Sequence, residues 1–161
     1  KNGIMVMGCF AFGSDEDYKD VFARTVAMCE EAKIDLPRFA VITPFPRTPY
    51  YRELAAQGRI VEKDWGMYDV EHVVYEPKNM TKPELEAGLL SAWRSAYSWR
   101  GILRRIDWRN ILRLHIGYLV FFLANIGYRQ YADRMEAFDD AAMVDNSDIP
   151  LPAVPSQAVG R

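Results

Sequence analysis

The chain has 161 residues, of which half are hydrophobic and 13% are aromatic, and its formal net charge is −2. This length fits one domain, and the apolar content is enough for a packed core, which argues against a disordered chain. The near-neutral charge gives no basic field, so no nucleic-acid partner is expected. The two cysteines, Cys9 and Cys29, are too few for a disulfide framework or a cysteine-rich metal site. We interpret them as reduced core thiols of a cytoplasmic protein.

The first segment is apolar. Residues 3–12 form a continuous apolar run bounded by glycines, which predicts a fully buried parallel strand. Ser14 is predicted to open a helix whose first turn holds Asp15, Glu16 and Asp17, because carboxylates there favour the helix dipole. No signal peptide or initiator methionine precedes the strand, so we expect the chain to be part of a longer polypeptide.

A second apolar run, residues 39–43, is short and rich in β-branched side chains, which predicts a second buried strand. Strand, helix and strand in this order make a βαβ unit with a parallel pair of strands. Three prolines within residues 44–49 then exclude helix and regular ladder pairing. Thr48 and Pro49 are suited to cap and begin a short helix that ends at Gly58.

The next part of the chain predicts a strand and a long helix. Residues 71–75 alternate in polarity and predict a short strand. Thr81 and Glu84 form a capping box for a helix predicted to continue through Leu103.

The histidines and methionines carry little functional signal. His72 and His115 are the only histidines, and neither has partners at metal-ligand spacing, so both are interpreted as structural. A substrate contact by His72 remains open. The scattered methionines are interpreted as core fillers: Met5, Met7, Met28, Met67 and Met80.

A last helix is predicted to begin after its cap, Asp107, and to run past Arg134. Within it, residues 114–128 contain no Asp, Glu, Lys or Arg, but this run is shorter than the roughly 20 residues that a membrane span needs. The run fits a helix packed in a core or on a partner, or an interfacial helix at a membrane surface. The arginines nearby predict a basic face that is either solvated or in contact with a membrane: Arg100, Arg104, Arg105, Arg109 and Arg113.

Three segments together resemble cobalamin-type radical S-adenosylmethionine enzymes. The stretch GIMVMGCFAFG at residues 3–13 resembles the fifth strand of the radical S-adenosylmethionine barrel. The stretch ITPFPRTPYY at residues 42–51 resembles the sixth strand and its exit, usually T-P-[FY]-P-G-T-P-L-Y. Residues 64–100, with WGMYD, HVVY and WRSAYSWR, resemble the C-terminal extension of a group that includes hopanoid methylases and anaerobic cyclase relatives.

The resemblance implies an α/β fold in three parts. Residues 1–58 would be the last βαβ portion of a TIM-like radical S-adenosylmethionine barrel, residues 59–140 a mostly α-helical extension, and residues 141–161 a disordered tail. The implied function is radical-based methyl transfer, or a related transformation, of a small molecule or lipid, with a substrate-shaping cap. The alternative is a non-catalytic α/β-helical binding module, or one that associates peripherally with a membrane.

The resemblance also implies cofactors. The family uses S-adenosylmethionine and a [4Fe–4S] cluster on a Cys-x3-Cys-x2-Cys loop, together with cobalamin. Cys9 and Cys29 are 20 positions apart and cannot form such a loop. No catalytic or metal-binding residue is therefore expected, and the cluster and cobalamin ligands would lie in a missing N-terminal part of the same polypeptide.

Part of the S-adenosylmethionine pocket is expected to carry over. The residues expected to line it are Val6, Gly8, Thr43, Pro44 and Phe45. Glycine at position 8 would allow close backbone approach to a ligand. One departure from the family pattern is Arg47, which stands where the proline motif usually has glycine. An arginine there would be strained if the position required a positive φ.

Overall fold

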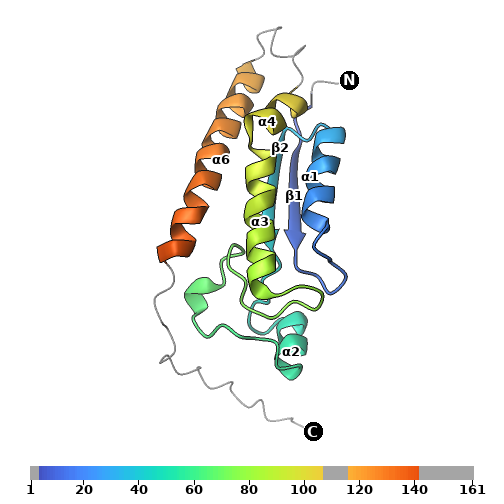
Figure 1. Cartoon of the computed structure of the whole chain (residues 1–161), viewed down its shortest axis with the longest axis vertical. Helices are drawn as coiled ribbons and strands as arrows, with labels where there is room; N and C mark the ends of the chain where they lie inside the picture. The colour runs from blue at the N-terminus through green and yellow to red at the C-terminus, as the bar shows by residue number, and fades with distance from the viewer. Residues whose placement is uncertain (1–3, 107–115, 142–161) are drawn as a thin grey trace.

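A computed structural model describes residues 4–106 and 116–141 (Figure 1). The elements follow in the order β1 (Met7–Phe12), α1 (Val21–Glu31), β2 (Leu36–Val41), α2 (Pro49–Ala56), the 3-10 helix η1 (Trp65–Met67), α3 (Lys82–Ala96), α4 (Trp99–Arg105) and α6 (Ile116–Ala141). Four residues named above (Asp107, Arg109, Arg113 and His115) and the tail from residue 142 lie outside the described residues.

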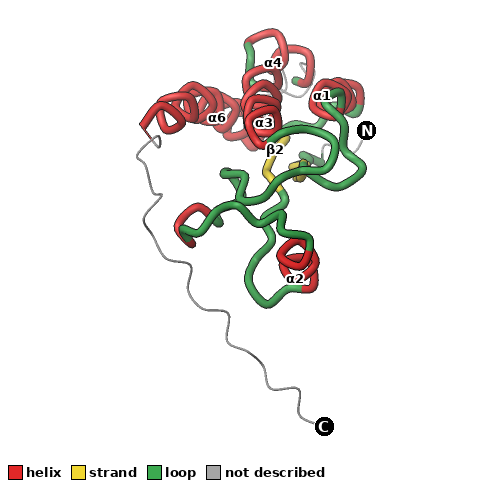
Figure 2. Tube along the Cα trace, turned by 60° about the horizontal axis from the view of Figure 1, so that its bottom comes forward, coloured by secondary structure: helices red, strands yellow, loops and turns green. Residues whose placement is uncertain are grey.

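The two strands pair in parallel, with Met7 opposite Leu36 and Phe12 opposite Val41. The predicted parallel βαβ unit is therefore confirmed, while its place in a barrel stays a prediction. The helices α1, α3 and α6 form a layer beside the sheet (Figures 1 and 2). Aromatic rings join this layer to the strands, because Phe12 meets Phe22 of α1 at 4.8 Å between ring centroids. Phe39 meets Trp93 of α3 at 5.6 Å in the same way.

The prediction of a fully buried first strand is wrong. Phe12 is buried, but Met7 is 51% exposed and Cys9 is also exposed. The physical reason is that helices cover only one face of the sheet, and β1 pairs with no other strand among the described residues. Cys29 is buried in the core as expected, whereas Cys9 is not a core thiol. Met7 and Met28 are likewise exposed rather than core fillers.

The first helix begins later in the chain than predicted. Its first turn begins at Val21, after the cap position Asp20. The carboxylate of Asp17 instead accepts hydrogen bonds from the backbone N–H groups of Gly13 and Ser14, at 2.9 and 3.0 Å. These bonds stabilise a loop after β1 in place of the helical turn. The second strand also begins three residues before the predicted one and ends at Val41.

Two helix caps are confirmed. The Thr48 hydroxyl accepts from the N–H of Tyr51 at 3.1 Å, and Pro49 is the first residue of α2. At α3, Thr81 and Glu84 form a reciprocal capping box, with the Thr81 N–H donating to the Glu84 carboxylate at 2.9 Å.

Residues 71–75 do not form a strand. One isolated bridge joins Ile60 to Tyr75, and Val73, Val74 and Tyr75 are all fully buried rather than alternating. Tyr75 meets Tyr50 of α2 and donates to the Gly13 carbonyl at the end of β1, so the buried part of the segment packs on both sides, while Glu71 before it is exposed.

The long helix predicted through Leu103 is two helices. α3 ends at Ala96 and α4 begins at Trp99, after Ser98, whose hydroxyl caps the new helix by accepting from the Gly101 N–H at 3.0 Å. The turn between them brings α4 back against α1.

This turn buries Arg105, which contradicts the predicted basic outer face. The residue is 1% exposed and donates to the carbonyl of Ala96 and to Oδ1 of Asn125 at 3.0 Å. Asn125 in turn donates to the Asp35 carbonyl at 3.1 Å, so the pair ties α6 to the sheet. Arg104 is more exposed and pairs with Glu30 at 2.9 Å.

Within the described residues, no helix is both long and apolar enough to cross a membrane. One side of α6 packs on the core through Phe121, Ala124 and Tyr128. Its other side leaves Leu119 and Leu123 each 57% exposed. A helix packed on the core is therefore observed, and an interfacial role for its exposed side stays a prediction.

Candidate functional site

The structure places the five expected pocket residues at two opposite ends of the sheet. Val6 and Gly8 lie at the start of β1, whereas Thr43 to Phe45 follow the end of β2. Gly8 is opposite Pro37, which precedes Thr43 by six residues. At about 3.3 Å per residue, the two groups are roughly 20 Å apart. That any of them contacts S-adenosylmethionine stays a prediction, but this chain does not bring all five together.

Local packing accounts for the two residues at the start of β1. The Val6 N–H donates to the carboxylate of Asp35 at 2.8 Å. A Cβ atom at Gly8 would lie 2.9 Å from the ring of Phe10 and 3.1 Å from Ile34, so a side chain there would displace core groups. Glycine at position 8 therefore has a packing explanation that needs no ligand.

The opposite end of the sheet, where both strands end, brings the other expected pocket residues next to the loop that follows β1. The Ile42 N–H donates to the Phe12 carbonyl at 2.9 Å, so the segments that begin at Gly13 and Thr43 leave the sheet side by side. Pro44 is buried, and Phe45 is 46% exposed. Ligands of open parallel sheets bind at this carboxyl end of the strands.

Gly13 lies at this end of the sheet and was not among the residues expected to line the pocket. Its φ is 101°, and a Cβ atom there would lie 2.3 Å from the hydroxyl of Tyr75, so only glycine fits. The Tyr75 hydroxyl donates to the Gly13 carbonyl from a fully buried position, and burial raises the pKa of Tyr75. The available sequence signal was the position of Gly13 directly after the strand, before a polar run.

An ion pair holds the loop that follows Gly13. Asp15 and Arg59 form two contacts, at 3.1 and 2.8 Å, and Arg59 Nε also donates to the Glu76 carbonyl at 2.8 Å. The hydrogen bond from Arg59 lowers the pKa of Asp15. Arg59 is 44 positions from Asp15 and Tyr75 is 62 from Gly13, so no local pattern could have shown these pairs.

A second loop covers the outer side of β2. The Val41 N–H donates to the Val70 carbonyl at 2.8 Å, and Val70 has a φ of 66°, which is strained for a β-branched residue. In this loop His72 Nδ1 lies 2.8 Å from Asp69 Oδ2. Burial acts to raise the pKa of Asp69, but hydrogen bonds from the Glu71 and His72 N–H groups and from the His72 ring lower it overall. A backbone hydrogen bond thus ties this loop to the end of β2.

The chain is similar to three curated enzymes. It is 33% identical over 107 residues, 66% of the chain, to the bacteriochlorophyllide d C-12(1)-methyltransferase of Chlorobaculum tepidum, covering 23% of that enzyme. It is 29% identical over 105 residues, 65% of the chain, to the bacteriochlorophyllide d C-8(2)-methyltransferase of the same organism, again covering 23% of it. It is 26% identical over 156 residues, 87% of the chain, to the anaerobic magnesium-protoporphyrin IX monomethyl ester cyclase of Cereibacter sphaeroides, covering 25% of it.

The chain therefore spans about a quarter of the length of the curated relatives it matches. No family model and no solved structure matches it. The similarities support the broad class indicated by the sequence motifs, the radical S-adenosylmethionine enzymes. The particular relatives are two methyltransferases and a cyclase, and the identities are too low to assign the chain to one of these groups.

Proposed function

We propose that this chain is the C-terminal part of a cobalamin-type radical S-adenosylmethionine enzyme that transfers a methyl group to a magnesium tetrapyrrole or transforms it in a related way. The observation that carries the proposal is the 33% identity over 107 residues to a bacteriochlorophyllide methyltransferase. The name of each of the three relatives contains a magnesium tetrapyrrole, either bacteriochlorophyllide or magnesium-protoporphyrin.

In this proposal β1 and β2 are the last strands of a TIM-like barrel. The outer edge of β1 pairs with no strand among the described residues, and Met7 and Cys9 expose one face. An unpaired edge of this kind can be completed by a further strand. The N-terminal part of the same polypeptide would supply that strand, and residues 59–140 would shape the substrate pocket.

Of the three implied cofactors (S-adenosylmethionine, the [4Fe–4S] cluster and cobalamin), the residues of this chain fit only the first, and only on one side. The carboxyl end of the sheet offers the backbone of Gly13 and the Thr43 to Phe45 turn, which suits one side of a nucleoside-like ligand such as S-adenosylmethionine. A cluster does not fit the side chains that the structure describes, residues 4–106 and 119–134, because no three His, Cys, Asp or Glu among them gather around a metal position. Cluster and cobalamin are therefore assigned to the rest of the enzyme.

The proposal is tested on the full-length protein by binding of S-adenosylmethionine in equilibrium dialysis. Phe45 is partly exposed beside the expected pocket, so Phe45→Ala should weaken binding about tenfold without unfolding the protein. Met28→Ala removes a similarly exposed apolar side chain near the C-terminal end of α1, away from the carboxyl ends of the strands, and should leave binding unchanged.

Product analysis completes this test. Mass spectrometry after anaerobic turnover with a magnesium tetrapyrrole should show a methylated or cyclised product and 5′-deoxyadenosine. Failure of the unaltered protein to bind S-adenosylmethionine, or equal binding by the two variants, would contradict the proposal.

A further inference from the structure

The two faces of the sheet carry different kinds of side chain. Partners in the parallel register lie on the same face, and successive residues alternate between faces. The face under α1 and α3 is built from large rings, those of Phe10, Phe12 and Phe39. The other face, called the open face, carries Met7, Cys9 and Ala11 of β1 and their partners on β2, which are Arg38, Ala40 and the buried Leu36.

The open face is unlike a surface made to receive another helix. Of its six side chains, four are small or flexible, one is the buried Leu36 and one is charged. Packing protein over it would bury Arg38, and burying a cation without a counter-charge is costly. A flat ligand with a negative group on its edge would cover the small side chains and leave the guanidinium paired.

A cation–π contact holds the Arg38 side chain in one position. Its guanidinium lies over the ring of Tyr128 in α6, 5.9 Å from the ring centroid. Because α6 belongs to the helix layer, the Arg38 side chain reaches from the open face past the outer edge of β2, where stacking fixes the planar group. Arg24 and Arg59 each pair with a carboxylate, but Arg38 pairs with none in the part of the chain that the structure describes.

We propose that the open face binds the substrate and that Arg38 anchors its carboxylate. This inference rests on the proposed function and deepens it. A magnesium tetrapyrrole such as those named for the relatives combines a flat, largely apolar macrocycle with a propionate carboxylate. The macrocycle would lie on Met7, Cys9 and Ala11, and the carboxylate would accept from the fork of the Arg38 guanidinium. Arg38 is thus a specificity-determining residue for substrates that carry a free carboxylate.

The first measurement uses Cys9 as a reporter, because Cys9 is opposite Arg38 in the register and exposed. The full-length protein is alkylated with N-ethylmaleimide, with and without magnesium protoporphyrin IX monomethyl ester, and modification is read per peptide by mass spectrometry. The porphyrin should slow the modification of Cys9 about tenfold. Cys29 is fully buried and serves as the unreactive internal reference.

The second measurement compares two porphyrins by fluorescence titration. The monomethyl ester has one free carboxylate and the dimethyl ester has none. Arg38→Gln should weaken binding of the monoester about tenfold or more, as expected for a lost charge-assisted contact, and leave the diester unchanged. Arg38→Lys should restore part of the affinity. Arg24→Gln, on the exposed side of α1, is the matched control and should bind both as the unaltered protein does.

The outcomes separate this inference from the proposed function. If the unaltered protein binds neither porphyrin, the tetrapyrrole substrate class fails, and the inference fails with it. If the monoester binds equally to Arg38→Gln, or if Cys9 remains fully reactive in its presence, the open-face inference alone is overturned.

Discussion

Arg47 adopts a φ of 69°, in the left-handed region that disfavours side chains with a Cβ atom. This explains why the proline motif usually has glycine at this position. The carbonyl of Arg47 accepts from the Arg52 side chain at 3.2 Å, a contact that does not depend on the side chain at position 47. The strain is therefore local and can be removed without loss of this hydrogen bond.

We expect Arg47→Gly to stabilise the protein by about 0.5–1 kcal/mol, since relief of the left-handed strain outweighs the added chain entropy of glycine. Gly58 has a similar φ of 68° and open space around it. Gly58→Ala therefore tests the opposite change, since it introduces a Cβ atom at a left-handed position. It should destabilise by about 1 kcal/mol. Urea unfolding of both variants measures the difference. Equal stability of all three proteins would contradict the strain argument.

Asp15 makes the protein sensitive to acid. The hydrogen bond from Arg59 holds the pKa of Asp15 below the ordinary value of an aspartate side chain. In the pH window between the folded and unfolded pKa, the unfolded state binds more protons, so stability rises with pH. The contribution is fully present above about pH 4 and is lost as the pH falls through the lower, folded value.

Asp15→Asn should therefore reduce stability at pH 6 and flatten the loss of stability between pH 5 and pH 3. Thermal unfolding across this range measures the effect. Asp20→Asn is the control, because Asp20 forms an exposed ion pair with Arg24 on α1, and such pairs contribute little to stability. A slope in Asp15→Asn as steep as in the unaltered protein would show that other carboxylates cause the acid sensitivity.

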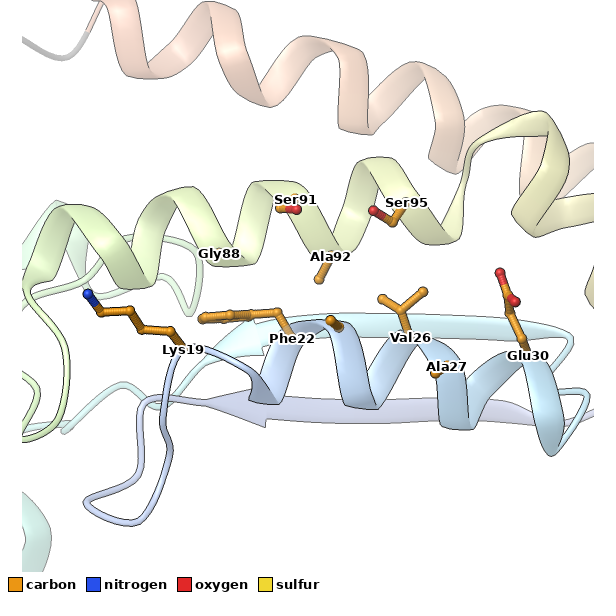
Figure 3. A pocket seen from close by; sticks show the side chains of 10 residues that line it. Lys19, Phe22, Val26, Ala27, Glu30, Gly88, Ser91, Ala92 and Ser95 are labelled. Carbon is orange, nitrogen blue, oxygen red and sulfur yellow. The ribbon is translucent and has the colours of Figure 1, made fainter.

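At the scale of elements, the contact between α1 and α3 depends on a glycine. A Cβ atom at Gly88 would lie 2.1 Å from the ring of Phe22, which points across to α3 in Figure 3. The two helices approach closely along a groove with small side chains on its walls, among them Ala27, Ser91 and Ser95 (Figure 3). Close approach lets the Phe22 ring reach Phe12 of the sheet.

Two helical glycines should respond in opposite ways to alanine. Gly88→Ala should destabilise by about 1–3 kcal/mol, because the Phe22 ring must leave its position or the helices must separate. Gly127→Ala in α6 meets nothing within 4 Å. It should stabilise by about 0.5–1 kcal/mol through helix propensity alone. Denaturant unfolding of the two variants tests this, and a stabilising Gly88→Ala would show that the α1–α3 contact tolerates a larger spacing.

At the scale of the whole molecule, α6 is the outermost part of the helix layer (Figure 2). The Arg105–Asn125 pair holds it to the sheet, while Leu119, Val120 and Leu123 face solvent. An exposed apolar side on an anchored helix has the character of an interfacial helix, the role left open by the sequence.

We expect the full-length protein to float with anionic phosphatidylglycerol vesicles in a density gradient. The triple variant Leu119→Gln, Val120→Gln, Leu123→Gln should remain at the bottom, because binding scales with the apolar area buried in the interface. Val61→Gln, an exposed apolar residue outside α6, is the control and should float. An unaltered protein that stays at the bottom ends the interfacial hypothesis.

The sequence was sufficient wherever the governing interaction is local. The caps at Thr48 and Thr81 depend on side chains three residues away, and the strand–helix–strand order follows from apolar periodicity. Local patterns failed where a competing contact comes from elsewhere. Asp17 was assigned to a helix although its carboxylate caps the loop after β1, and the helix break at Ser98 was hidden in a continuous helical pattern.

The amino-acid sequence by itself thus determined the parallel βαβ unit, the helix caps and the resemblance to a broad enzyme class. Only the tertiary structure decided that Gly13, not Gly8, lies beside Thr43, that Arg105 is buried, and that one sheet face stays open. The reason is that these features depend on partners far away in the chain. Tyr75 reaches Gly13 over 62 positions and Asn125 reaches Asp35 over 90, and no spacing rule encodes which distant groups will meet.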